Sequence, residues 1–117
     1  MISLNKIARD IHKLNESWWL DLETGEQKER NIGELLMLVT TELSEALEAH
    51  RKNLMDDKLP HRKGFEVEIA DALIRLFDLS GGLGLDIDGA LYEKLEYNKK
   101  RADHDPRNRL KDGGKKY

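Results

Sequence analysis

Cysteine is absent from this chain of 117 residues, only two residues are proline, and aromatic residues make up 6%. Without cysteine there is no disulfide, no thiol nucleophile and no thiolate metal site. The scarcity of proline, aromatic and β-branched residues favours helices over sheet. The sequence therefore predicts an all-α protein, and a chain of this length suits one compact domain.

Neither an excess of positive charge nor a long apolar run is present. The formal net charge is −3 at pH 7 and the pI is near 5.8, which disfavours a site for duplex nucleic acid. No apolar run approaches the length of a membrane span, and the first residues lack the apolar core of a secretory signal. We therefore expect a cytoplasmic protein that binds neither a membrane nor a nucleic acid duplex.

Apolar residues recur at helical spacing in four segments, which are expected to form helices over residues 2–17, 32–53, 63–79 and 87–102. Asn31 and Asp86 are the expected N-caps of the second and fourth helices, and the Ser-Gly-Gly at 80–82 is expected to end the third. Apolar residues make up 38% of the chain and charged residues 37%. With so little apolar content, the chain must concentrate its apolar residues on helix stripes or bury extra surface in an oligomer. The sequence predicts a four-helix-bundle-like single domain over residues 1–117, assembled as a homo-oligomer, with a polar tail at 104–117.

Two glutamates of the expected second helix project toward its apolar side. At about 100° per residue, Glu42 falls on the flank of the apolar arc, and Glu45 lies one turn further along at its edge. Glu34 and Glu48 project toward water. Only the first two acids are therefore expected to face the interior.

The expected third helix is apolar around most of its circumference, which is typical of a helix at the centre of an assembly. Its narrow polar strip consists of Glu68, Asp71, Arg75 and Asp78, at positions i, i+3, i+7 and i+10. A buried carboxylate is costly unless it is paired or binds a metal. The acids of the second and third helices are therefore expected to converge on one polar pocket.

Carboxylate oxygens are the preferred ligands of hard cations, so this pocket predicts a site for Mg²⁺, with Mn²⁺ as a substitute. A di-iron bundle would need a Glu-x-x-His motif, and none of the four histidines has a glutamate three residues before it. Ordinary helix salt bridges on a solvated face are the alternative, because they use the same spacings. The absence of lysine from the two strips favours the metal site.

The expected fourth helix places two cations beside an amide. Asn98 falls in its apolar face, and Lys94 and Arg101 lie on the flank, four residues before and three residues after it. Such a group can bind phosphate oxygens, Arg through forked bonds and Lys as a point charge. Snorkelling at the edge of a core explains the same pattern, so both interpretations stay open.

Trp18 and Trp19 stand at the entrance to the polar connection between the first two helices. Either indole can stack on a nucleobase. A tryptophan near a helix end more often packs into a core or a subunit interface. A base contact and an interface contact both remain candidate roles for this pair.

The order of these motifs resembles that of the MazG-like all-α nucleotide pyrophosphohydrolases. Glu42-Leu43-Ser44-Glu45, followed after 22 residues by Glu68-Ile69-Ala70-Asp71, is similar to their Glu-x-x-Glu…Glu-x-x-Asp signature. Residues 94–101 are similar to the Lys…Asn…Arg element of their last core helix, and residues 109–116 resemble the ending of short single-domain members, including phage-encoded ones. The resemblance covers residues 31–103 well and the two ends more loosely.

The resemblance implies a dimeric or tetrameric helical bundle that hydrolyses a nucleoside triphosphate between the α and β phosphates, releasing a monophosphate and pyrophosphate. It implies magnesium held by Glu42, Glu45, Glu68 and Asp71, phosphates bound by Lys94, Asn98 and Arg101, and Asp78 as a further acid beyond the second motif. We expect Glu45 to be the catalytic residue that also orients the attacking water.

Other interpretations remain beside this one. A dUTP- or dCTP-restricted diphosphatase and a phosphoribosyl-ATP pyrophosphohydrolase would use similar acids and differ in the base pocket. A non-enzymatic acidic helical interaction module would carry the same charges as surface decoration. Thermal stabilisation by magnesium separates that module from the enzymes, because a ligand of the folded state raises apparent stability.

Overall fold

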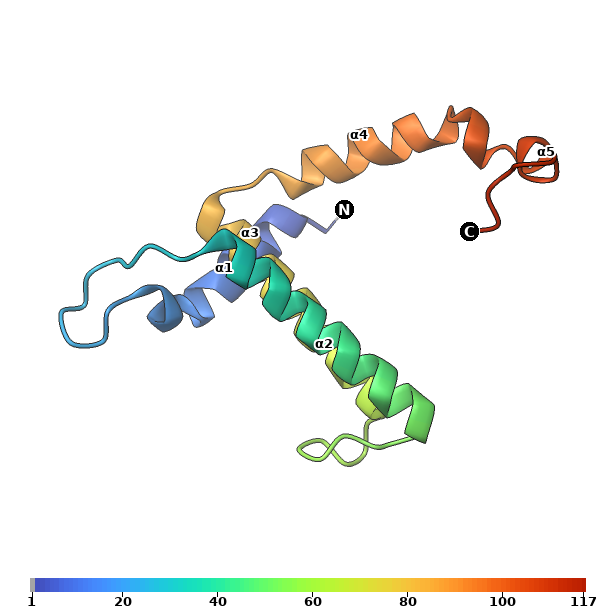
Figure 1. The fold of residues 1–117 in the computed structure, drawn as a ribbon. Helices are drawn as coiled ribbons and strands as arrows, with labels where there is room; N and C mark the ends of the chain where they lie inside the picture. Colours follow the sequence, from blue (N-terminus) through green and yellow to red (C-terminus); the bar gives the residue numbers. More distant parts are fainter. Residues whose placement is uncertain (1) are drawn as a thin grey trace. The chain divides into compact units, whose positions relative to one another are not determined.

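The computed structural model describes residues 2–117, and helices are the regular secondary structure of this part of the chain (Figure 1). The longer helices are α1 (Leu4–Leu14), α2 (Ile32–Lys52), α3 (Gly64–Leu83) and α4 (Ile87–Lys99). The short ones are η1 (Glu16–Trp19), η2 (Ala102–His104) and α5 (Pro106–Arg109). The expected all-α fold class is confirmed. Within residues 2–117, no helix combines the length and apolar character that crossing a membrane requires.

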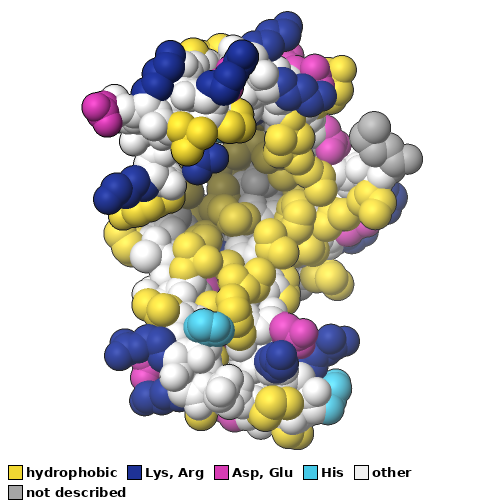
Figure 2. All heavy atoms as spheres, turned by 90° about the vertical axis from the view of Figure 1, so that its right-hand side faces the viewer, with side chains coloured by type: hydrophobic (Ala, Val, Ile, Leu, Met, Phe, Trp, Pro, Cys, Tyr) yellow, Lys and Arg dark blue, Asp and Glu magenta, His cyan; other side chains and the backbone are white. Residues whose placement is uncertain are grey.

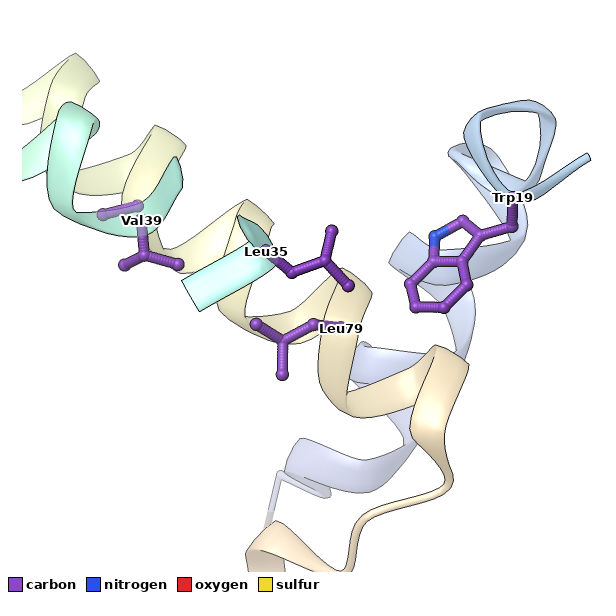
Figure 3. Packing of buried hydrophobic residues seen from close by; sticks show 5 residues of the cluster. Trp19, Leu35, Val39 and Leu79 are labelled. Carbon is purple, nitrogen blue, oxygen red and sulfur yellow. The ribbon is translucent and has the colours of Figure 1, made fainter. Parts of the chain in front are cut away.

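The chain divides into two compact units, Met1–Leu85 and Asp86–Tyr117. The first contains α1, η1, α2 and α3, and the second contains α4, η2 and α5. In the first unit, both α1 and α2 pack against α3. The core there consists of Trp19, Leu35, Val39, Ala72 and Leu79 (Figure 3). Because η1, α2 and α3 all contribute to it, this core ties the first half of α2 to η1 and α3.

Two glycines inside α3 allow α1 to approach it closely. The helix continues through Gly81 and Gly82 to Leu83, so the predicted end at Leu79 is wrong. A Cβ on Gly81 would overlap the carbonyl oxygen of Ala8, and a Cβ on Gly82 would lie 2.7 Å from the Trp19 ring. The glycines therefore serve close packing here, and the helix ends at Gly84, whose φ of +66° suits glycine.

The N-caps follow the sequence prediction more closely than the helix ends do. The Oδ1 of Asn31 accepts a hydrogen bond from the backbone N–H of Glu34 at 3.0 Å, and Asp86 caps α4 in the same way through Gly89. The predicted ends of the first and fourth helices are wrong: α1 ends at Leu14 and α4 at Lys99. The backbone N–H groups of Asn15, Lys100 and Arg101 donate to the last carbonyls of these two helices, and a 3₁₀ segment follows each of them.

Many large apolar side chains on α2 and α3 stay in contact with solvent. Exposure of 38–62% is found for Leu36, Met37, Leu43, Leu47, Phe65, Ile69, Leu73 and Ile74. Many apolar side chains are visible at the surface in Figure 2. The chain by itself therefore buries much less apolar surface than the sequence pattern of α2 and α3 would allow.

Candidate metal centre

Three of the four predicted metal-binding acids lie together where α2 packs against α3. One carboxylate oxygen from each of Glu42, Glu68 and Asp71 lies within 4.8 Å of the other two. Glu42 belongs to α2, and the other two are one turn apart on α3. We call these three residues the acid cluster. Glu45 is exposed and is not among the three, but its negative charge raises the pKa of both Glu68 and Asp71.

Arg75 is the cation that the structure places against the acid cluster. Its Nε donates to Oε1 of Glu42 at 2.9 Å, and Glu42 is only 9% exposed. Arg75 follows Asp71 by one turn on the polar strip of α3, so the strip itself supplies the partner. One guanidinium facing three carboxyl groups leaves the cluster short of positive charge.

Glu68 shows the effect of this shortage most clearly. Burial, then hydrogen bonding with the carboxyl groups of Glu42 and Glu45 and their negative charges, raises the pKa of Glu68 to about 8. The side chain therefore keeps its proton at neutral pH when no other cation is present. Its Oε2 is buried and has no hydrogen-bond partner. A buried oxygen without a partner calls for an explanation such as an ion that belongs there.

The pKa of Asp71 is raised by burial and by the negative charges of Glu42 and Asp56, while Arg75 lowers it. The sequence analysis did not single out Asp56, which is 8% exposed and lies in the connection between α2 and α3. Its Oδ2 accepts from the backbone N–H groups of Lys58 and Leu59 at 2.9 and 2.7 Å. Aspartate commonly accepts hydrogen bonds from backbone N–H groups two or three residues later in a turn, and this preference is the signal that could have identified Asp56 from the sequence.

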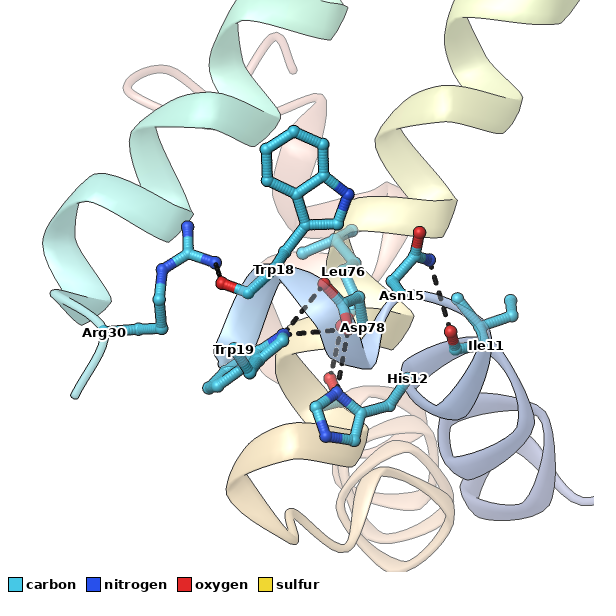
Figure 4. Close-up of polar contacts among 9 residues, drawn as sticks. Ile11, His12, Asn15, Trp18, Trp19, Arg30, Leu76 and Asp78 are labelled. Atoms are coloured by element: carbon cyan, nitrogen blue, oxygen red, sulfur yellow. Dashed lines mark hydrogen bonds and ion pairs between the residues drawn. The ribbon is translucent and has the colours of Figure 1, made fainter. Parts of the chain in front are cut away.

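Asp78 lies on the same strip but has other partners. Trp19 Nε1 donates to both of its oxygens at 3.2 Å, and Nδ1 of His12 lies 2.9 Å from Oδ1 (Figure 4). The imidazole and the indole also meet edge to face, with centroids 5.0 Å apart. Asp78 therefore joins α1 and η1 to α3 and is not part of the acid cluster. His12 was not among the predicted site residues.

A cavity of about 670 Å³ in the first unit is lined by two members of the acid cluster but not by Glu68. Its wall includes Glu42, Asp71 and Arg75 from the cluster region and Trp18, Lys28 and Arg30 from the chain before α2; the others are Asn15, Glu34, Leu35, Leu38, Ile74 and Asp78. Trp18 is 67% exposed and lines this cavity, whereas Trp19 is 6% exposed and belongs to the core. The two neighbouring tryptophans therefore have different environments.

The predicted phosphate-binding residues of α4 belong to the second unit. Lys94 Nζ lies 4.9 Å from the centroid of the Tyr97 ring, and Arg101 Nε donates to Asp103 at 2.9 Å. That ion pair raises the pKa of Arg101 and holds the pKa of Asp103 well below its usual range. Phosphate binding by Lys94, Asn98 and Arg101 stays a prediction.

The donor set of the acid cluster fits a hard divalent cation. It offers carboxylate oxygens on two rigid helices, one of them without a partner, and Mg²⁺ and Mn²⁺ bind through such oxygens and retained waters. Comparison of the chain with protein-family models, with curated proteins and with solved structures gives no match. The candidate function therefore rests on the site itself and on the sequence motifs.

Proposed function

We propose that the protein is a metal-dependent nucleoside triphosphate pyrophosphohydrolase whose metal ligands include Glu42, Glu68 and Asp71. The observation that carries this proposal is the surplus of carboxyl groups at one point, with a buried Glu68 oxygen left unpartnered. A cluster that only stabilised the fold would be matched by cations or hydrogen-bond donors, as Asp78 is. A divalent cation would supply the positive charge that Arg75 alone does not provide for three carboxyl groups.

The choice of reaction rests on the motif order and on the cavity. The Glu-x-x-Glu…Glu-x-x-Asp spacing resembles that of MazG-like enzymes, which implies attack between the α and β phosphates. The cavity opens directly beside two of the acids and carries Trp18 in its wall. An exposed indole in a cavity wall can stack on a nucleobase, so Trp18 is the better base-contact candidate of the two tryptophans.

Each acid has a proposed task. A divalent cation would neutralise phosphate charge there and lower the pKa of a bound water. Glu42, Glu68 and Asp71 hold the ligand oxygens in place from two packed helices. Glu45 is proposed to orient the attacking water and accept its proton, because it is close enough to influence Glu68 yet exposed. The resemblance supports phosphate binding by Lys94, Asn98 and Arg101, and this role is part of the proposal.

We further propose that the protein works as a homodimer or homotetramer. The exposed apolar side chains of α2 and α3 support this, because a solvated monomer rarely leaves so many large apolar groups uncovered on one pair of helices. Sedimentation equilibrium tests the assembly directly. A monomer at micromolar concentration would contradict it.

The deciding experiment is a panel of nucleoside triphosphates, dUTP, dCTP and phosphoribosyl-ATP included, incubated with Mg²⁺ and assayed for pyrophosphate. Activity should disappear in EDTA and return with Mg²⁺ or Mn²⁺, while Ca²⁺, with its looser geometry, should restore little of it. Turnover of one pyrimidine nucleotide alone would identify a base-restricted diphosphatase. Orthophosphate release without added pyrophosphatase, or full turnover in EDTA, would contradict the proposal.

A further inference from the structure

We propose that Lys28 and Arg30, in the segment between η1 and α2, are binding residues for the polyphosphate chain of the substrate. The inference deepens the proposed function and rests on it for the identity of the substrate. The sequence analysis assigned phosphate binding to α4 alone. Lys28 and Arg30 line the same cavity as Glu42 and Asp71, within the first unit.

Backbone contacts hold these two cations in the cavity wall. The backbone N–H of Lys28 donates to the carbonyl oxygen of Trp19 at 2.9 Å, and the segment is closed by a bridge between Leu20 and Gln27. Arg30 Nη1 donates to the carbonyl oxygen of Trp18 at 2.9 Å (Figure 4). Its guanidinium carbon also lies 5.5 Å from the centroid of the Trp19 ring. The segment is therefore anchored on the buried core tryptophan.

Neither cation has a carboxylate in ion-pair contact within residues 2–117, and the charge of Lys28 acts on Asp21 only at longer range, where it helps to lower the pKa of that carboxyl. Among the described residues, neither Lys28 nor Arg30 forms an ion pair within 4.0 Å. The Arg30 side chain donates to the Trp18 carbonyl through Nη1, which leaves its other N–H groups for a further acceptor. A guanidinium and an ammonium without a carboxylate in ion-pair contact can donate to phosphate oxygens.

The charges of the cavity explain why a metal must come first. Three cations, Lys28, Arg30 and Arg75, and four carboxyl groups, Glu34, Glu42, Asp71 and Asp78, line it. This wall has no positive excess and does not attract a polyanion. One divalent cation on the acid cluster reverses the balance, so a polyphosphate chain is then held between the metal and the two cations. Binding of polyphosphate should accordingly require the metal and weaken as salt is added.

The test is calorimetric titration of inorganic tripolyphosphate into the full chain with Mg²⁺ present. Lys28→Gln and Arg30→Gln should each lower its affinity about tenfold, since each removes a charge-assisted hydrogen bond. Arg30→Lys should recover part of the loss. Lys13→Gln removes an exposed α1 lysine that does not line the cavity and serves as the matched control. Mn²⁺ titrated alone should bind all these variants as it binds the wild type.

Two outcomes would overturn the inference: unchanged tripolyphosphate affinity in the Lys28→Gln variant, or an equal loss in the Lys13→Gln control. Lys28 is decisive if Arg30→Gln fails to fold, because the Lys28 side chain is exposed. Failure of this inference is distinguishable from failure of the proposed function. A double variant that hydrolyses nucleotides with wild-type KM removes only the phosphate-binding role. A wild type that binds tripolyphosphate but cleaves no nucleotide removes only the enzyme.

Discussion

Two acidic sites on α3 face opposite electrostatic situations. Near the start of the helix, Glu68 and Asp71 meet Glu42 across the α2–α3 contact, and the pKa of each α3 acid is raised. Two turns after Asp71, Asp78 accepts hydrogen bonds from Trp19 and lies against His12. Acidic residues on one polar strip thus have too few cations and donors around them at Glu68 and Asp71, whereas Asp78 has enough. The first arrangement is typical of a binding site and the second of a structural contact.

The largest expected effect is on activity at the acid cluster. Glu68→Gln and Asp71→Asn should each lower kcat/KM at least about 100-fold, because losing a metal ligand costs more than losing its supporting partner. Both variants should melt in EDTA at or above the wild-type midpoint, since Asp71→Asn relieves repulsion between carboxyl groups and Glu68→Gln removes the cost of keeping Glu68 protonated in the folded state. Mg²⁺ should raise the midpoint of the wild type and shift the variants much less. Calorimetric melting with EDTA and with Mg²⁺ measures this.

Glu66→Gln is the matched control, because Glu66 is exposed on α3 and pairs with Arg62 at 3.8 Å. It should leave both activity and the magnesium shift unchanged. If Asp71→Asn melts far below the wild type in EDTA and Mg²⁺ shifts neither protein, the acid cluster is a structural ion-pair site.

A smaller contrast is expected between two glutamates one turn apart on α2. Glu45→Gln should lower kcat about 100-fold, at the low end of the range for a lost general base, with little change in KM. Glu48→Gln should be nearly silent, because Glu48 pairs with Lys52 at 2.6 Å, away from the acid cluster. Steady-state kinetics of the two variants test this, and equal losses in both would mean that Glu48 also reaches the site.

The next effect is on stability at Asp78. Asp78→Ala should lower the free energy of unfolding by about 2 kcal/mol, because it leaves the part-buried Trp19 Nε1 without an acceptor. Urea denaturation followed by tryptophan fluorescence measures it. Asp10→Ala, which breaks only the exposed pair with Lys6, should change little. An Asp78→Ala variant as stable as the wild type would show that this network does not anchor α1.

The smallest effect is the pH dependence of the metal-free protein. The folded-state pKa of Glu68 is about 8, above the ordinary 4.5, so between these values the folded chain holds a proton that the unfolded chain has lost. This contribution to stability is complete below pH 4.5 and is lost as pH rises through 8. The melting midpoint in EDTA should therefore fall between pH 5 and pH 8 more steeply in the wild type than in Glu68→Gln. Parallel pH profiles would contradict the raised pKa.

The sequence by itself determined the helices and their faces, because helical periodicity and N-caps depend on residues three or four apart. Asn31 caps α2 as predicted, and Glu42 is buried on the apolar side of that helix. The meeting of Glu42 with Glu68 and Asp71 also agrees with the projection, since two apolar stripes that pack together bring their flanking acids together. The local pattern of apolar and polar residues was enough to predict these features.

Only the tertiary structure decided the rest, because it depends on residues far apart in the chain. His12 reaches Asp78 across 66 positions, and this contact turns a candidate site acid into a structural one. Gly81 and Gly82 read as a helix end in sequence, yet the close approach of Ala8 and Trp19 makes them part of α3. Lys28 and Arg30 lie in a polar connection without periodicity, so only the anchoring of that segment on Trp19 places them in the cavity wall. Long-range packing selects among contacts that local sequence leaves equally available.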